Sequence, residues 1–228
     1  ISGEHGIFIK KEENKKIIIK QLAKAILHFV TADTSLKIDA FLLKDFKNNS
    51  LLISDELKKY KYHPFSVEQN MTFKLNKQWL VFDDYLAAMK TKFRVKARKA
   101  FMRSKEIRIE EVTMGNIDSQ LLQMTNLYQK VVANANFNLV HFNLKTFKDL
   151  KELLEDNYII RSYWLNNKMV GFISGVINQK SLDAHFVGID YLLNREHAIY
   201  QRMLYNYIEI GINKKLHTIN FGRTAGEI

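Results

Sequence analysis

The 228-residue chain contains no cysteine, a single proline and no long apolar run. Without cysteine there can be no disulfide bond, no zinc site with thiolate ligands and no cysteine nucleophile, which agrees with a reducing compartment such as the cytoplasm. No apolar segment approaches the ~20 residues that a bilayer-spanning helix needs, and no signal-peptide pattern opens the chain. We therefore expect a cytoplasmic protein without a membrane span.

Several catalytic signatures are also missing. The seven histidines include no pair at metal-ligand spacing with a carboxylate partner, so no metal site is predicted. The ATPase phosphate loop, the nucleophile elbow and the dinucleotide-binding fingerprint are absent as well. These absences argue against several large enzyme classes.

The composition that remains is that of a folded, basic protein. Hydrophobic residues make up 46% of the chain and charged residues 26%, which suits one or two globular domains. Lysine and arginine exceed aspartate and glutamate by 35 − 24 = 11. This charge favours anionic partners such as nucleic acid, CoA phosphates or acidic lipid headgroups. The alternative is that lysine-rich usage reflects genome composition alone.

The first third of the chain alternates helix-like and strand-like segments. Apolar residues at helical spacing predict a helix over residues 16–30, and Ser54 begins a short helix that reaches Tyr60. Short β-prone runs predict strands over residues 7–9, 36–43 and 67–75. We predict a partial α/β unit over residues 1–80, without a catalytic cluster.

Residues 82–105 carry apolar side chains every three or four positions, which predicts one long amphipathic helix. Its polar side is almost wholly basic, with two rows of cations: Lys90, Arg94 and Arg98 in one, and Lys92, Lys96, Lys99 and Arg103 in the other. These rows could hold a phosphate-rich ligand. Equally, they could form a solvated face whose side-chain stems cover apolar neighbours.

The remaining segments predict an α+β, mixed α/β fold, with a mostly antiparallel central sheet flanked by helices. A strand over residues 108–113 is followed by helices over 118–133 and 144–155. Three antiparallel strands follow, over residues 158–165, 169–178 and 181–190. Asn166, Asn167 and Lys168 form the first tight turn. A helix over residues 195–214 and a strand over 217–221 complete the order.

This element order resembles the front of a domain of the GNAT superfamily, the acyl-CoA N-acyltransferases, in its Fem-like branch of peptidoglycan-type transferases. Three local motifs are similar to that branch: residues 167–172, where Gly171 lets two elements approach closely, the ending Asn220-Phe221-Gly222-Arg223, and the basic run over residues 92–100. The resemblance implies a GNAT-like acyltransferase domain over residues 81–228 that lacks its last elements. Residues 1–80 would then be part of a first, tandem GNAT-like unit, and both ends would be cuts in a longer protein.

The resemblance also implies a function and a donor site. The chain would transfer an acyl or aminoacyl group from acetyl-CoA, another acyl-CoA or an aminoacyl-tRNA to a small-molecule or peptide amine acceptor. The CoA-binding residues would be Val187, Gly188, Ile189, Asp190, Asn194, Arg195, Glu196, His197 and Ala198, where a helix start faces the pyrophosphate. The chain departs from the family pattern here, because the usual glycine-rich corner is missing.

Acyl transfer to an amine needs a route for the amine proton and a donor for the leaving group. Strict alternation on the strand over 181–190 places Asp183, His185, Val187 and Ile189 on one face, so His185 beside Asp183 is the candidate base. Tyr200 and Tyr205 are candidate proton donors to the leaving group, and Arg223 is a candidate substrate anchor. Each of these residues also has a structural explanation. His185 could be a histidine of the sheet surface whose hydrogen bond is satisfied, the two tyrosines could pack in the core, and Arg223 could stabilise a turn.

Two functions from other classes stay open. The chain could be a nucleic-acid-binding module that uses the basic helix without catalysis, although it lacks a recognised binding motif. It could also be a degenerate transferase fold kept as a scaffold, which the missing glycine-rich corner favours.

Overall fold

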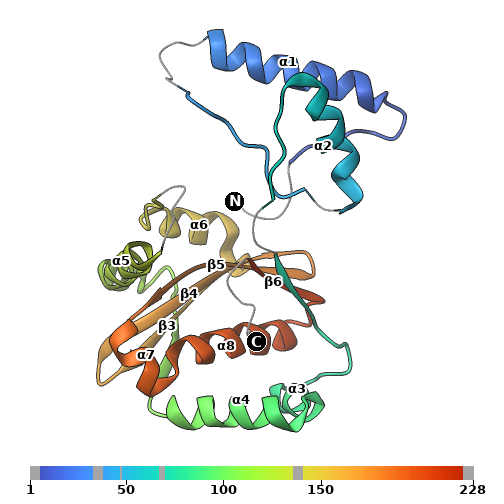
Figure 1. Cartoon of the computed structure of the whole chain (residues 1–228). Coiled ribbons are helices and arrows are strands. Elements are labelled where there is room, and N and C mark those ends of the chain that lie inside the picture. The colour runs from blue at the N-terminus through green and yellow to red at the C-terminus, as the bar shows by residue number, and fades with distance from the viewer. Residues whose placement is uncertain (1–5, 33–37, 47, 67–69, 136–140, 223–228) are drawn as a thin grey trace. The chain divides into compact units, whose positions relative to one another are not determined.

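The computed structural model describes residues 6–32, 38–46, 48–66, 70–135 and 141–222. The chain divides into two compact units, Ile1–Glu68 and Gln69–Ile228. Figure 1 shows the elements of both units along the chain.

The described part of the first unit is helical. It contains α1 (Lys15–Ala32), α2 (Leu51–Leu57) and two 3-10 turns (Asn48–Ser50 and Lys58–Tyr60). The Asn14 side chain caps α1 by accepting hydrogen bonds from the backbone N–H groups of Lys16 and Ile17. Its small core comprises Ile19, Ala23 and Leu57.

The predicted strands of this unit are not formed. Residues 7–9 and 38–43 lie outside any strand, and Leu36 and Lys37 lie outside the described residues. Ile9 and Leu43 pack instead against the helical core. Short apolar runs become strands only where a neighbouring strand pairs with them, and here two helices cover them instead.

The second unit is built on a six-stranded sheet with the order β1-β6-β5-β4-β3-β2. Its strands are β1 (Met71–Lys74), β2 (Arg108–Glu111), β3 (Tyr158–Leu165), β4 (Lys168–Asn178), β5 (Ser181–Ile189) and β6 (Thr218–Gly222). All neighbours are antiparallel except β5 and β6, which are parallel. This confirms the predicted fold class. β1 lies within the residues predicted for the first domain but completes the sheet of the second unit.

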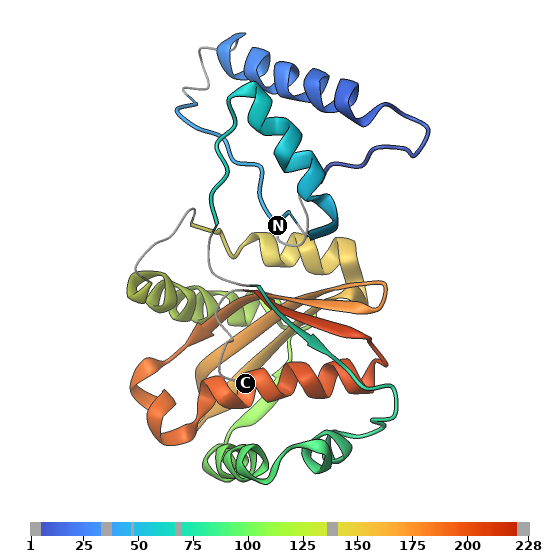
Figure 2. The ribbon, with the colours of Figure 1, turned by 45° about the vertical axis from the view of Figure 1, so that its right-hand side comes forward.

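Helices cover both faces of this sheet (Figures 1 and 2). One face carries α5 (Ile117–Asn134) and α6 (Thr146–Leu154), whose side chains share a core with Ile160 and Phe172. The other face carries α8 (Ile199–Asn213), and α3 (Phe82–Ala88), α4 (Thr91–Arg103) and α7 (Tyr191–His197) pack around it. The two apolar faces account for the buried runs of β3 and β4.

Two predicted helices are each broken in two. The helix expected over residues 82–105 is interrupted at Met89 and Lys90, whose extended ψ angles are 144° and 143°. Met89 packs against the core, and the Arg94 guanidinium donates to the carbonyl of Ala87 (3.1 Å), which caps α3. The helix expected over residues 195–214 is split at Ala198, which adopts a left-handed conformation (φ 49°).

The hairpin between β3 and β4 confirms the predicted tight turn. Asn166 and Asn167 both have positive φ, 49° and 61°, as a two-residue type I′ turn requires. Gly171 also does what its motif predicts. A Cβ atom there would lie 2.0 Å from Met203 Cε, so glycine lets β4 and α8 approach closely.

Gly188 supplies a test of this close packing. A Cβ atom there would lie 2.2 Å from Phe172 Cε1 and 2.8 Å from Leu127 Cβ. We expect Gly188→Ala to lower the free energy of unfolding by about 3 kcal/mol because the surrounding core must shift. Gly115→Ala is the matched control, since its new Cβ would meet only Thr113 Oγ1 at 3.7 Å. Urea unfolding measures both, and equal losses would contradict the packing explanation.

Candidate functional site

β5 and β6 pair over only three residues and then separate. The parallel register joins Ser181–Asp183 to residues 218–220, and no described residue of β6 pairs with β5 beyond Asp183. β5 nevertheless continues to Ile189, while β6 ends at Gly222 and pairs with β1 along its other edge. The second half of β5 therefore has a backbone edge without a strand partner in the described part of the chain. We call this place the β5–β6 junction, comprising residues 184–189 of β5 and the facing end of β6.

A β-bulge between β4 and β5 lies next to this junction. The register shifts between Ile173 and Gly175, and Ser174 Oγ accepts from Phe186 N (2.9 Å) and donates to Phe186 O (3.2 Å). The bulge interrupts the alternation along β5. Val187 and Ile189 pack on the α8 face together with Leu182 and Ala184. The prediction that Val187 and Ile189 share a face with His185 is therefore wrong.

His185 lies on the α5–α6 face among aromatic rings. Its ring centroid is 4.2 Å from that of Phe186 and 5.8 Å from that of Phe142, and Nδ1 lies 3.3 Å from the Tyr158 hydroxyl. Burial lowers the pKa of His185 to about 4. The imidazole is therefore neutral at neutral pH, which leaves a nitrogen lone pair available.

Asp183 does not orient this histidine by a hydrogen bond. Asp183 Oδ1 accepts instead from Asn220 Nδ2 (3.0 Å), across the paired part of β5 and β6. Among the described contacts, none joins Asp183 to His185. The two predicted neighbours thus have separate partners.

The lowered pKa of His185 has a consequence for stability. The unfolded chain binds a proton to this histidine near its ordinary pKa of 6.5, whereas the folded chain resists it down to about pH 4. Stability is therefore fully present above pH 6.5 and falls as the pH drops toward 4. We expect a loss of about 2 kcal/mol, which is less than the full shift implies because the ring is only partly buried.

Unfolding midpoints in urea at pH 7.0, 5.5 and 4.5 measure this loss. His185→Phe keeps an aromatic ring in the cluster and removes the titrating group, so its stability should fall less over the same range. An unchanged pH dependence in this variant would assign the loss to other groups.

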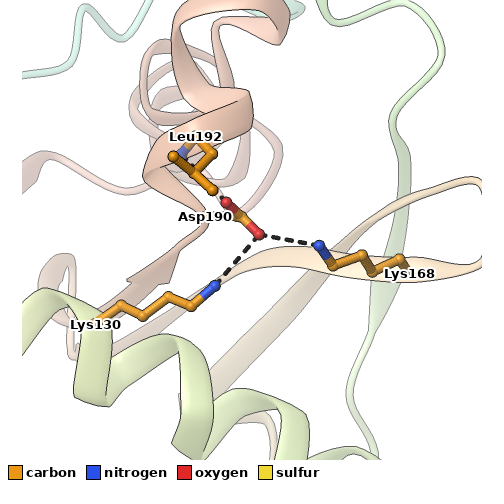
Figure 3. Close-up of polar contacts among 4 residues, drawn as sticks. All are labelled: Lys130, Lys168, Asp190 and Leu192. Atoms are coloured by element: carbon orange, nitrogen blue, oxygen red, sulfur yellow. Dashed lines mark hydrogen bonds and ion pairs between the residues drawn. The ribbon is translucent and has the colours of Figure 1, made fainter.

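Asp190 stands where β5 ends and α7 begins (Figure 3). Its side chain is only 3% exposed, and Oδ1 caps α7 by accepting from Leu192 N (3.2 Å). Lys130 Nζ and Lys168 Nζ both point at Oδ2, at 3.4 and 3.2 Å. Burial alone would raise the pKa of Asp190, but the two ammonium groups hold it below its ordinary value. A carboxylate therefore occupies the start of α7.

The start of α8 is also occupied by a side chain of the chain itself. Asn194 Oδ1 accepts from Tyr200 N (2.8 Å), beside the left-handed Ala198. Arg195 and Glu196 are exposed, and the Glu196 carbonyl accepts from Arg103 Nε (2.8 Å). The residues predicted to cradle a pyrophosphate thus cap and join α4, α7 and α8.

The two candidate tyrosines lie on different sides of α8. Tyr205 packs against Phe101 and Phe82, with ring centroids 5.6 and 6.2 Å away, and burial raises its pKa. Tyr200 shares a helical face with Tyr207, seven residues later. The Tyr207 hydroxyl donates to the Ser174 carbonyl at the bulge (2.7 Å). No local sequence pattern around Tyr207 predicts this contact. Arg223 lies outside the described residues.

The basic residues of the predicted long helix include arginines that form hydrogen bonds and lysines that are exposed. Arg94 and Arg103 donate to backbone carbonyls at the ends of α3 and α7. Three lysines of α4 are exposed and have neither a hydrogen bond nor an ion pair among the described contacts: Lys92, Lys96 and Lys99. We call these three residues the α4 lysine row.

Two kinds of feature are absent from the residues that the structure describes. No three histidine, aspartate or glutamate side chains there gather as metal ligands would. None of the described helices is both long enough and apolar enough to cross a membrane.

Comparisons with known proteins identify the fold. No protein-family profile matches the chain, and no curated protein does. Among solved structures, FemX matches with a TM-score of 0.56 and 10% identity, over 93% of this chain and 69% of FemX. At this identity the likeness establishes the fold alone, and it confirms the Fem-like, GNAT-type resemblance at that level.

Two further structures match less closely. An aminoglycoside acetyltransferase from an uncultured soil metagenomic sample matches with a TM-score of 0.40 and 16% identity, over 50% of this chain and 76% of its own. The C-terminal domain of a putative lysylphosphatidylglycerol synthetase from Agrobacterium fabrum matches with a TM-score of 0.49 and 12% identity. That match spans 70% of this chain and 47% of the synthetase domain chain.

Proposed function

We propose that this chain, which has the fold of FemX, transfers an acyl group to an amine acceptor at the β5–β6 junction, with an aminoacyl-tRNA as the preferred donor. The observation that carries the proposal is the end of the β5–β6 pairing after Asp183. An unpaired strand edge offers backbone N–H and C=O groups to an extended ligand. A donor's acyl arm could lie along residues 184–189 in this way.

The capped helix starts favour a tRNA-linked donor over acyl-CoA. A CoA pyrophosphate at the start of α7 would lie beside the Asp190 carboxylate, which already accepts from Leu192 N. Like charges that lie so close together repel, and at each helix start one backbone donor, Leu192 N or Tyr200 N, already has a side-chain partner within the chain. The predicted contacts of residues 187–198 with CoA therefore remain a prediction only for acyl-CoA, the second candidate donor.

The α4 lysine row supports the same choice. Lys92, Lys96 and Lys99 have no acidic partner among the described residues, so they are available to phosphates. A polynucleotide donor would engage several such cations at once, whereas CoA carries its phosphates at one end. A tRNA is thus the partner that uses this surface best.

The proposed chemistry is aminolysis. The acceptor nitrogen forms a bond to the acyl carbonyl carbon, the bond from that carbon to the donor oxygen breaks, and one proton leaves the nitrogen while one reaches the leaving oxygen. We keep His185 as the proposed base, since it is neutral above about pH 4, with Asp183 in the same strand. Of the two tyrosines we propose Tyr200 for the leaving group, because Tyr205 packs against Phe101 and Phe82. Tyr205 and the substrate role of Arg223 stay predictions, as does a cytoplasmic location.

Calorimetric titration of the full 228-residue chain with an aminoacyl-tRNA and, separately, with acetyl-CoA tests the choice of donor. We expect tight binding of the tRNA that weakens steeply with salt, and no binding of acetyl-CoA at millimolar concentration. Acetyl-CoA binding with no tRNA binding would replace the preferred donor with the second one. Binding of neither would favour a scaffold that has kept the fold without the activity.

A further inference from the structure

A polar pocket lies toward the β2 edge of the sheet. It has a volume of about 340 Å³ and is lined by residues of β2, β3 and α8. Its lining carries two arginines, Arg161 and Arg202, together with Glu111 and Glu209. In the strand order β4 lies between β5 and β3, the nearest strand that lines the pocket, and none of residues 184–189 lines it, so it is distinct from the proposed transfer site.

Asn206 holds the wall of the pocket in place. It is only 2% exposed, and its Oδ1 accepts from the Tyr163 hydroxyl (2.8 Å) and from Arg161 Nη1 (3.2 Å). Its Nδ2 donates to Glu209 Oε2 (2.7 Å). The buried Asn206 amide thus holds both the Arg161 guanidinium and the Glu209 carboxylate in place.

Arg202 presents unused donors to the pocket. Its guanidinium lies over the Phe101 ring, 4.2 Å from the centroid, which fixes its plane. Among the described contacts it has no hydrogen-bond acceptor and no ion pair. Burial lowers its pKa, but an arginine stays charged at neutral pH. A planar guanidinium with free N–H groups is well suited to bind a carboxylate through two hydrogen bonds.

The charges of the pocket balance. Glu110 is paired with Arg108, which leaves two cations, Arg161 and Arg202, against the two anions Glu111 and Glu209. A simple anion would gain the arginines but meet the repulsion of the glutamates. A ligand that carries one carboxylate and one ammonium group can place the carboxylate near the two arginines and the ammonium group near the two glutamates.

We infer that this pocket binds a small zwitterion, an α-amino acid or a dipeptide. The carboxylate is held by Arg202 with Arg161, and the ammonium group by Glu209 with Glu111. The volume suits a molecule of this size and excludes a folded partner. This site stands independently of acyl transfer, because no group of the β5–β6 junction lines it.

Calorimetry of the full chain with L-alanine and L-alanyl-L-alanine tests the inference, with acetate, methylammonium and inorganic phosphate as single-charge probes. We expect at least one zwitterion to bind about tenfold or more tightly than every single-charge probe. Arg202→Gln and Glu209→Gln should each weaken that binding about tenfold, the second while keeping an acceptor for Asn206. Lys20→Gln on α1 removes an exposed charge outside the pocket and should leave the affinity unchanged.

Unfolding midpoints of the three variants show whether each one folds. Phosphate binding more tightly than the zwitterions would make this an anion site and overturn the inference. Zwitterion binding that survives in folded Arg202→Gln and Glu209→Gln would place the ligand elsewhere. If no zwitterion binds at millimolar concentration, the inference fails, and the hydrogen bonds around Asn206 serve only to stabilise the fold.

Discussion

Replacing Lys92, Lys96 and Lys99 together by glutamine is expected to weaken aminoacyl-tRNA binding about 100-fold at 0.1 M salt. Each lysine that neutralises a phosphate releases about one counterion, so three lost contacts also reduce the slope of log K against log salt by about 2 to 3. The fold should be unaffected, because these side chains are exposed and unpaired among the described residues. Filter binding over a salt series measures both quantities.

A charge-matched control comes from the first unit. Lys16, Lys20 and Lys24 are exposed along α1, and their replacement by glutamine removes the same net charge. If tRNA is held at the α4 lysine row, the control keeps nearly full affinity. Equal losses in the two triple variants would mean that the basic chain attracts nucleic acid without a defined surface.

Replacing Asn206 by leucine is expected to cost about 3 to 5 kcal/mol of unfolding free energy. The Tyr163 hydroxyl is fully buried and would lose its acceptor, while Arg161 and Glu209 would lose the amide that positions them. Buried polar groups left without partners carry their full desolvation cost, and here several are affected together. Urea unfolding at neutral pH measures the loss.

Gln120 offers the opposite case and serves as the control. It is 5% exposed, and its Oε1 is a buried polar atom without a hydrogen-bond partner among the residues that the structure describes. Gln120→Leu removes this unsatisfied group, so stability should be unchanged or higher. A loss from Gln120→Leu as large as that from Asn206→Leu would show that the volume of the side chain, and not its hydrogen bonds, sets the cost.

Periodic segments with local turns were predictable from sequence. The two asparagines at 166 and 167 fixed the β3–β4 hairpin because they tolerate positive φ, and α5 and α6 followed from their apolar spacing. The pairing of β1 with β6 was not predictable, since it joins Met71 to Gly222 across most of the chain. A short β-prone run gives no sign of which distant strand it will join.

Breaks inside elements also escaped sequence reasoning. The extended Met89 and the left-handed Ala198 depend on tertiary contacts and carry no glycine or proline as a marker. The bulge at Ser174 adjoins Gly175, but a glycine inside a strand does not by itself fix where the register shifts. The candidate site was partly predictable, because two of the residues proposed from the sequence lie there: His185 in the β5–β6 junction and Asp190 directly after it. The pocket around Asn206 was not, since its members come from three distant elements.

Hydrogen exchange of the backbone amides, with and without bound aminoacyl-tRNA, tests the central claim most directly. Donor binding along the β5–β6 junction predicts slower exchange in residues 184–189, together with slower exchange in α4, and no change in α1. Slower exchange in α4 alone, with residues 184–189 unchanged, would contradict the claim. The chain would then bind nucleic acid through its basic helix without placing an acyl donor in the junction.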